Sequence, residues 1–187
     1  MNEFFIALGA NLPSGGHPPS ETLAAALEAI RFKNIDILAV STFYQTPCFP
    51  PGAGPDYVNG AAHLKCDMAP KDMLSHLHEI ESDFGRQRIE RWGTRSLDLD
   101  LIACGESVLP DMQTFTRWLR LSPADQRTLA PDELILPHPR LQDRAFVLVP
   151  LRDIAAQWRH PVLDKTVEDL CNALSPDALA EIVVLES

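Results

Sequence analysis

The sequence of 187 residues contains no apolar run that approaches the roughly 20 residues of a membrane-spanning helix. Its first residues lack the positive charge of a signal peptide and carry an acidic residue, Glu3, instead. The four cysteines form no C-x-x-C pair, which argues against a zinc site and against a disulfide framework. We therefore expect a cytoplasmic protein with reduced, mostly structural cysteines, namely Cys48, Cys66, Cys104 and Cys171.

Positive charge is also scarce, with 16 Lys and Arg against 26 acidic residues and a net charge of -10. The surface as a whole repels nucleic acid and anionic lipid, so we expect small-molecule partners rather than nucleic acid or a membrane. Segment 85–95 is the exception, because it holds four Arg and one Glu. Arg presents a fork of donors that matches phosphate oxygens, which indicates a site for a small polyanion. The alternative is a solvated helix end with salt bridges to Glu79, Glu81 and Glu90.

Familiar nucleotide-binding motifs are missing too. There is neither a Walker-type G-x-x-x-x-G-K-[ST] nor a Gly-rich kinase loop, so a nucleotide enzyme would belong to neither common kind. The chain also shows no internal repeat, no low-complexity tract and no domain-splitting linker. With 45% hydrophobic and 22% charged residues, we expect one globular domain that spans residues 1–187.

Hydrophobic patterning predicts an α+β fold. A strand in 4–11 ends in Gly9, a helix follows with Ser20 as its N-cap, strands 35–46 and 57–66 pair as a hairpin, and helix 70–81 precedes strand 96–103. This order is typical of the ferredoxin-like split βαβ core, an antiparallel sheet with helices on one face.

The remaining residues read as C-terminal additions to that core. Residues 109–133 are polar and contain Pro, which predicts a long inserted connection with room for one short helix. The apolar run 146–151 resembles a buried strand, and Thr166 with Asp169 forms a capping-box pattern before a helix. A last strand is expected at 182–185.

The stretch 97–101 alternates Leu with Asp on its predicted strand. Residues two apart share a face, so the leucines enter the core while Asp98 and Asp100 stand together, about 7 Å apart at their backbones. One interpretation is an exposed face with solvated carboxylates. The other is a site for Mg²⁺, which prefers one or two carboxylates together with water and phosphate. The nearby Arg95 favours the second, because metal and Arg around one polyanion are typical of phosphoryl transfer.

Several motifs together resemble the 6-hydroxymethyl-7,8-dihydropterin pyrophosphokinase family of folate biosynthesis. The main pair is "RWGTRSLDLDLI" (91–102) and "LPHPRLQDRAFVLVPL" (136–151), and "IALGANL", "STFYQTP", "PDYVNGA" and "IESDFGR" follow the family's order. The resemblance covers roughly residues 3–165. It implies an ATP-dependent diphosphotransferase that moves pyrophosphate to the pterin hydroxymethyl group and releases AMP.

The resemblance also implies roles for individual residues. Asp98 and Asp100 would bind two Mg²⁺ ions with ATP as co-substrate, and Arg86 and Arg95 would be catalytic. We nominate no general base, although Asp98 lies where one could act. The implied nucleotide contacts are Glu81, Arg88, Trp92, Arg95, Leu101, His138 and Arg144. The implied pterin contacts are Thr46, Pro47, Phe49, Tyr57, Asn59, Trp92 and Phe146.

Three departures from the family pattern bear on these roles. The sequence has "GANLP" near its start, the loop "PCFPPGAGP" has its own length, and the 109–133 connection enters just before "LILPHP". Nucleotide preference and the choice among Arg86, Arg88 and Arg91 for the catalytic contact are therefore left open. We expect a monomer. The alternative functions are a ferredoxin-like nucleotide-binding module without catalysis and a conventional ADP-forming kinase.

Overall fold

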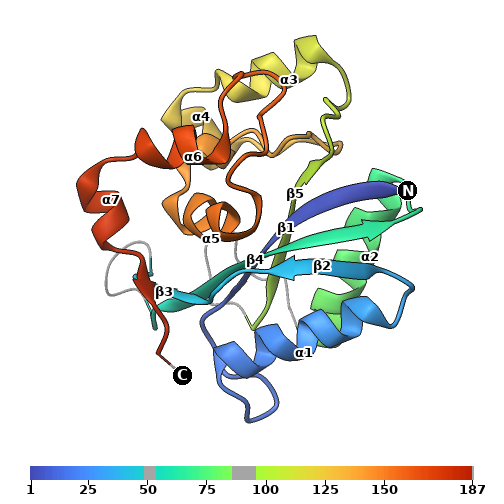
Figure 1. Cartoon of the computed structure of the whole chain (residues 1–187), viewed down its shortest axis with the longest axis vertical. Coiled ribbons are helices and arrows are strands. Elements are labelled where there is room, and N and C mark those ends of the chain that lie inside the picture. The colour runs from blue at the N-terminus through green and yellow to red at the C-terminus, as the bar shows by residue number, and fades with distance from the viewer. Residues whose placement is uncertain (49–53, 86–95, 187) are drawn as a thin grey trace.

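A six-stranded antiparallel sheet lies at the centre of the computed structural model, which describes residues 1–48, 54–85 and 96–186 (Figure 1). Strands β5 (Asp98–Cys104), β1 (Asn2–Ala10), β4 (Tyr57–Cys66), β3 (Tyr44–Thr46) and β6 (Val183–Val184) follow one another across it. Strand β2 (Asp36–Val40) pairs with the other end of β4. Because β2 and β3 share one edge of β4, the order matches the split βαβ core, and the predicted α+β fold is confirmed.

One face of the sheet is covered by helices α1 (Pro19–Arg31) and α2 (Pro70–Asp83) (Figure 1). Their apolar residues join Phe4, Ile6 and Leu8 of β1 in the first hydrophobic core. The α2 prediction is confirmed, but the N-cap predicted for α1 is wrong. Pro18 occupies that position and Pro19 begins the helix, because the fixed φ of proline suits a first helical turn that needs no N–H.

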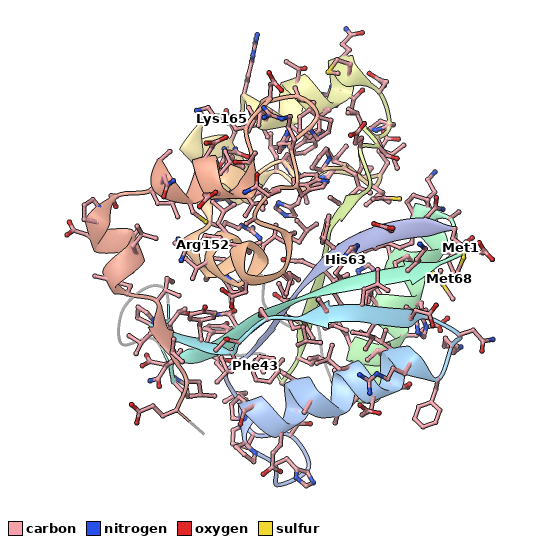
Figure 2. All side chains as sticks on the ribbon, viewed as in Figure 1. Met1, Phe43, His63, Met68, Arg152 and Lys165 are labelled. Carbon is pink, nitrogen blue, oxygen red and sulfur yellow. The ribbon has the colours of Figure 1, made fainter. Side chains whose placement is uncertain are left out.

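The C-terminal additions cover the opposite face (Figure 1). Side chains fill the space between the sheet and the helices on both sides (Figure 2). Residues from β1 and β5 pack there against α5 and α6 in a second core. The elements of this half are α3 (Met112–Leu119), α4 (Pro123–Thr128), a 3-10 turn (Leu141–Asp143), α5 (Ala145–Ala155), α6 (Val167–Asn172) and α7 (Pro176–Ala180).

The strand predicted at 146–151 is wrong, because these residues belong to helix α5. A short apolar run does not reveal its period, and here Val147, Leu148 and Leu151 form one buried helical face. Pro150 within the helix made the helical assignment less obvious from sequence. The capping box of Thr166 and Asp169 is confirmed at the start of α6.

Two strand boundaries also differ from the prediction. The stretch 35–46 forms two strands, because the Ser41 Oγ accepts a hydrogen bond from the Ala61 N–H (2.9 Å) where the pairing changes. Strand β1 does not end at Gly9 but continues to Ala10. Gly9 is therefore a residue of the sheet rather than of the following turn.

The two ends of the inserted connection lie side by side in the structure. Residues 109–133 contain two short helices rather than one, and an isolated antiparallel bridge joins Leu109 to Leu136. The two residues exchange backbone hydrogen bonds of 2.9 and 3.2 Å. The length of the insertion therefore does not displace the segment that follows it.

All four cysteines are buried, and none of them forms a disulfide bond. Within the described residues, no helix has the length and apolar character needed to cross a membrane.

His160 is a buried titratable group in the C-terminal half. It is 0% exposed and lies between the rings of Phe115 and Trp158, at centroid distances of 5.8 and 5.9 Å. Its Nδ1 accepts hydrogen bonds from the backbone N–H groups of Val162 and Leu163. Burial lowers the pKa of His160 to about 4.

This pKa predicts a loss of stability in mild acid. Below about pH 6.5 the His160 imidazole is protonated in the unfolded chain but stays neutral in the folded chain. The free energy of unfolding should therefore fall as the pH drops towards 4, by up to about 3 kcal/mol. His160→Asn keeps an acceptor near Nδ1 and should remove this part of the pH dependence, measured by urea unfolding at several pH values. Phe115→Leu should lower stability but keep the slope. Equal slopes in wild type and His160→Asn would contradict the assignment.

Candidate active site

The Leu and Asp residues of β5 point to opposite faces of the sheet, as the alternation predicted. Leu97, Leu99 and Leu101 are all buried in the first core. Asp98 and Asp100 are partly exposed on the opposite face. The alternation ends at Ile102, because the pairing with β1 shifts there and both Ile102 and Ala103 join the second core.

Glu81 holds β5 at the edge of the sheet. Its side chain is 2% exposed, and its Oε1 accepts a hydrogen bond of 2.7 Å from the Leu99 N–H. Among the strands that the structure describes, β5 pairs with β1 alone, so α2 supplies a partner for this edge amide through the Glu81 carboxylate. The peptide between Asp98 and Leu99 is thereby fixed. The nucleotide contact predicted for Glu81 stays a prediction.

Arg144 lies beside the second acid of the pair. Its Nη1 is 3.3 Å from Asp100 Oδ2, and its Cζ lies 5.7 Å from the centre of the Phe146 ring. The Arg144 side chain is 19% exposed, whereas Phe146 is 40% exposed. Phe146 is therefore not a core residue despite its apolar run. Arg144 brings a positive charge to Asp100, and the partly exposed Phe146 ring lies beside Arg144.

His138 is joined to β5 through the backbone. Its N–H donates to the carbonyl of Ile102, the extra residue of the β5 irregularity, at 2.7 Å. Burial of the imidazole, followed by the charges of Arg144 and Arg140, holds the pKa of His138 well below its ordinary value. Nδ1 accepts the N–H of Arg140 at 3.1 Å, so the neutral ring carries its proton on Nε2. At neutral pH this group is a hydrogen-bond donor without charge.

Asn59 and Thr46 form a second polar group on the sheet. The Asn59 Nδ2 donates to Thr46 Oγ1 at 2.7 Å, and the two side chains are 6% and 5% exposed. The nearby Tyr57 is partly exposed and Pro47 is exposed. The hydrogen bond fixes the orientation of the Asn59 amide, which suits a group that reads the edge of a heteroaromatic ring.

Helix α5 is hydrogen-bonded to the sheet near β3, the strand that carries Thr46. Asp153 accepts hydrogen bonds from the Tyr44 hydroxyl at 2.9 Å and from the Thr42 N–H at 3.2 Å. Burial, and then the hydrogen bond to Asp153, raises the pKa of Tyr44, which stays protonated as a donor. The contact ties the start of β3 to the helix that carries Phe146.

One row across the sheet brings the two polar groups together. Gly9 of β1 lies opposite Asp98 of β5 on one side and opposite Asn59 of β4 on the other. Directly opposed residues of antiparallel strands share a face, so Asp98, Gly9 and Asn59 line one surface. The strand spacing places the β5 and β4 backbones about 10 Å apart. In the next row, Ala7 lies between Asp100 and Ala61.

Some predicted site residues are not placed by these contacts. Leu101 is in the row of core leucines, so its side chain does not reach the acid face, and a nucleotide contact through its backbone stays a prediction. The remaining predicted residues lie outside the described residues, namely Phe49, Arg86, Arg88, Arg91, Trp92 and Arg95.

The donor set fits a hard cation that shares its ligands with substrate. Within residues 1–48, 54–85 and 96–186, no three His, Cys, Asp or Glu side chains group closely enough to hold a metal alone. Two carboxylates on one strand face, partly open to solvent, are what Mg²⁺ uses when water and phosphate complete its shell. The sequence marked Glu81 as a nucleotide contact, but its bond to the β5 backbone carries no local signal. Gly9 was missed as a residue of this surface, although a Gly inside an apolar strand could have marked it.

Carboxylates with a flanking Arg on a ferredoxin-like sheet are groups that enzymes of phosphate chemistry use. The family model described as 7,8-dihydro-6-hydroxymethylpterin-pyrophosphokinase (HPPK) matches residues 5–156. The chain belongs to this family.

Curated relatives and solved structures agree with that assignment. The chain is 35% identical over 179 residues to a 2-amino-4-hydroxy-6-hydroxymethyldihydropteridine pyrophosphokinase of Synechocystis, covering 92% of this chain and 79% of that protein. It is 38% identical over 162 residues to a protein of the same name from Pseudomonas aeruginosa, covering 86% and 85%. Plasmodium falciparum HPPK-DHPS has a TM-score of 0.64 at 14% identity, covering 91% of this chain and 44% of that one. At that identity the structure supports the fold alone.

The bond between Glu81 and β5 predicts a stability effect. Glu81→Ala leaves the Leu99 N–H without its acceptor, which should cost about 1–3 kcal/mol in the free energy of unfolding by urea titration. Glu81→Gln keeps an acceptor oxygen and should cost less. The control Glu79→Ala removes an exposed acid of the same helix and should stay within about 0.5 kcal/mol of wild type. A Glu81→Ala protein as stable as wild type would show that the hydrogen bond between Glu81 and the Leu99 N–H does not stabilise β5.

Proposed function

We propose that this protein transfers pyrophosphate from ATP to the hydroxymethyl group of 6-hydroxymethyl-7,8-dihydropterin, with release of AMP, in folate biosynthesis. Membership of the HPPK family supports the reaction, and the acid pair on β5 is the observation that carries it. Asp98 and Asp100 stand on a strand that is anchored by buried leucines and by Glu81, next to the Arg144 guanidinium.

The proposed step exchanges one bond to phosphorus for another. The pterin hydroxymethyl oxygen forms a bond to the β-phosphorus of ATP as the bond from that phosphorus to the α,β-bridging oxygen breaks. AMP leaves with the bridging oxygen, and the proton of the alcohol passes to solvent or to a nearby carboxylate. Such a reaction depends mainly on position and on neutralisation of charge.

Asp98 and Asp100 would hold two Mg²⁺ ions, which supply neutralisation of the phosphate charge when bound. Arg144 orients Asp100 from the side and adds a positive charge that cannot be titrated away. His138 offers the Nε2–H as a neutral donor to the nucleotide. Arg86, Arg88 and Arg95 are proposed phosphate contacts on the basis of sequence, and Glu81 acts by holding β5.

We assign the pterin to the Asn59 end of the row formed by Asp98, Gly9 and Asn59. The amide of Asn59, held by Thr46, would read the polar edge of the ring, and Phe146 would offer an aromatic face. Tyr57, Pro47, Phe49 and Trp92 complete the proposed pocket from sequence. The hydroxymethyl group would then point along the row towards Asp98 and the phosphates.

The wider properties of the protein belong to the same proposal. We propose a single pyrophosphokinase domain over residues 1–187 that works as a cytoplasmic monomer. The bridge between Leu109 and Leu136 supports ATP use despite the inserted connection, because it keeps His138 beside β5.

The test is to incubate the protein with ATP, Mg²⁺ and the reduced hydroxymethyl pterin, and to identify the nucleotide released by chromatography. The proposal predicts AMP in a one-to-one ratio with pterin diphosphate. Release of ADP would instead favour a conventional kinase. Nucleotide binding without turnover would favour a non-catalytic module.

Neutralising either acid of β5 should greatly reduce turnover without unfolding the protein. Asp98→Asn and Asp100→Asn should each lower kcat by on the order of 10²–10³, because one carboxylate ligand of the charged site is lost. Thermal melts should stay close to wild type, since relief of the repulsion between like charges offsets, for Asp100, the loss of its ion pair with Arg144. The control Asp36→Asn, an exposed strand acid of β2, should keep full activity. A severe loss of folding in either site variant would point to a structural role.

A further inference from the structure

Gly9 lies at the centre of the row that joins the two polar groups, yet its backbone does not require glycine. It is an extended residue of β1, and it is not among the glycines of the described chain with positive φ. Glycine inside a strand weakens the strand, because it loses more conformational entropy and offers no side chain for packing. Its value at this position therefore has to come from the space that it leaves.

The Asn59 side chain lies next to the space that Gly9 leaves open. A Cβ on Gly9 would lie 3.0 Å from the Asn59 Oδ1 and 4.0 Å from the Asp98 Cβ. A contact of 3.0 Å is tighter than ordinary packing, so the amide would have to move by a few tenths of an ångström. Asn59 is 6% exposed and its Nδ2 is bonded to Thr46 at 2.7 Å, so the shift would turn the amide away from its present orientation.

We propose that Gly9 is a positioning residue for the pterin, which keeps the Asn59 amide in register with the acid pair by having no side chain. The inference rests on the proposed function and deepens it. Gly9 faces Asn59 and Asp98 directly, so any atom added there intrudes between the group that would read the ring and the group that would hold the metal and phosphates. The close contact is with Asn59, so the pterin is the substrate that should suffer.

The experiment compares the affinities of Gly9→Ala for the two substrates. Isothermal titration would measure binding of the hydroxymethyl pterin, with a non-hydrolysable ATP analogue and Mg²⁺ present, and binding of the analogue itself. We expect the Kd of the pterin to rise at least about tenfold, and the Kd of the ATP analogue to stay within about twofold. The melting temperature should change little, because a side-chain amide can yield where a backbone cannot.

Gly60→Ala is the matched control, since it adds the same atom to the neighbouring strand. Gly60 pairs with Leu8, whose side chain is in the first core, and a Cβ there would lie 2.7 Å from the Phe43 ring (Phe43 is labelled in Figure 2). This variant should lose thermal stability without a selective loss of pterin affinity. It separates damage to the sheet from damage to the position of Asn59.

Each other outcome overturns the inference. Unchanged pterin affinity in Gly9→Ala, or an equal loss for both substrates, would show that Gly9 does not act through Asn59. A Gly9→Ala protein that does not fold would assign the glycine to the sheet alone. Failure of the proposed function has a different signature, because the wild-type protein would then bind no pterin and release no AMP.

Discussion

The hydrogen bond from the Leu99 N–H to the buried Glu81 carboxylate is the constraint on which the site depends. Within the described residues β5 pairs with β1 alone, and it carries two acids whose charges repel each other. Burial of the leucines fixes the face of β5, and Glu81 supplies a partner for the Leu99 amide on its other side. Asp98 and Asp100 are thereby held on a rigid element, where a metal site needs its ligands.

The central strand β1 relates this acid pair to the rest of the site. It pairs with β5 on one side and with β4 on the other, so a single register places Asp98 and Asn59 on either side of Gly9. The second core then seats α5 over the same face, and Tyr44 anchors that helix through Asp153. Arg144 reaches Asp100 because α5 begins there, and Phe146 lies beside Arg144. One sheet and one helix thus assemble groups that are far apart in the chain.

Much of this arrangement could be predicted from the sequence, because local pattern decides it. The alternation of Leu and Asp gave the two faces of β5, and the order of elements gave the ferredoxin-like core. The helix at 146–151 could not be told from a strand, since a short apolar run has no readable period. The contact of Glu81 joins α2 to Leu99, and that of Gly9 joins β1 to Asn59 on β4. No local pattern encodes either one.

The proposed reaction requires that the acids of β5 bind a metal together with the nucleotide. The direct measurement is calorimetric titration of a non-hydrolysable ATP analogue into wild type and into the double variant Asp98→Asn/Asp100→Asn, each with Mg²⁺ and with EDTA. We expect Mg²⁺ to strengthen binding to wild type and to have little effect on the variant. An equal gain from Mg²⁺ in both proteins would contradict this requirement.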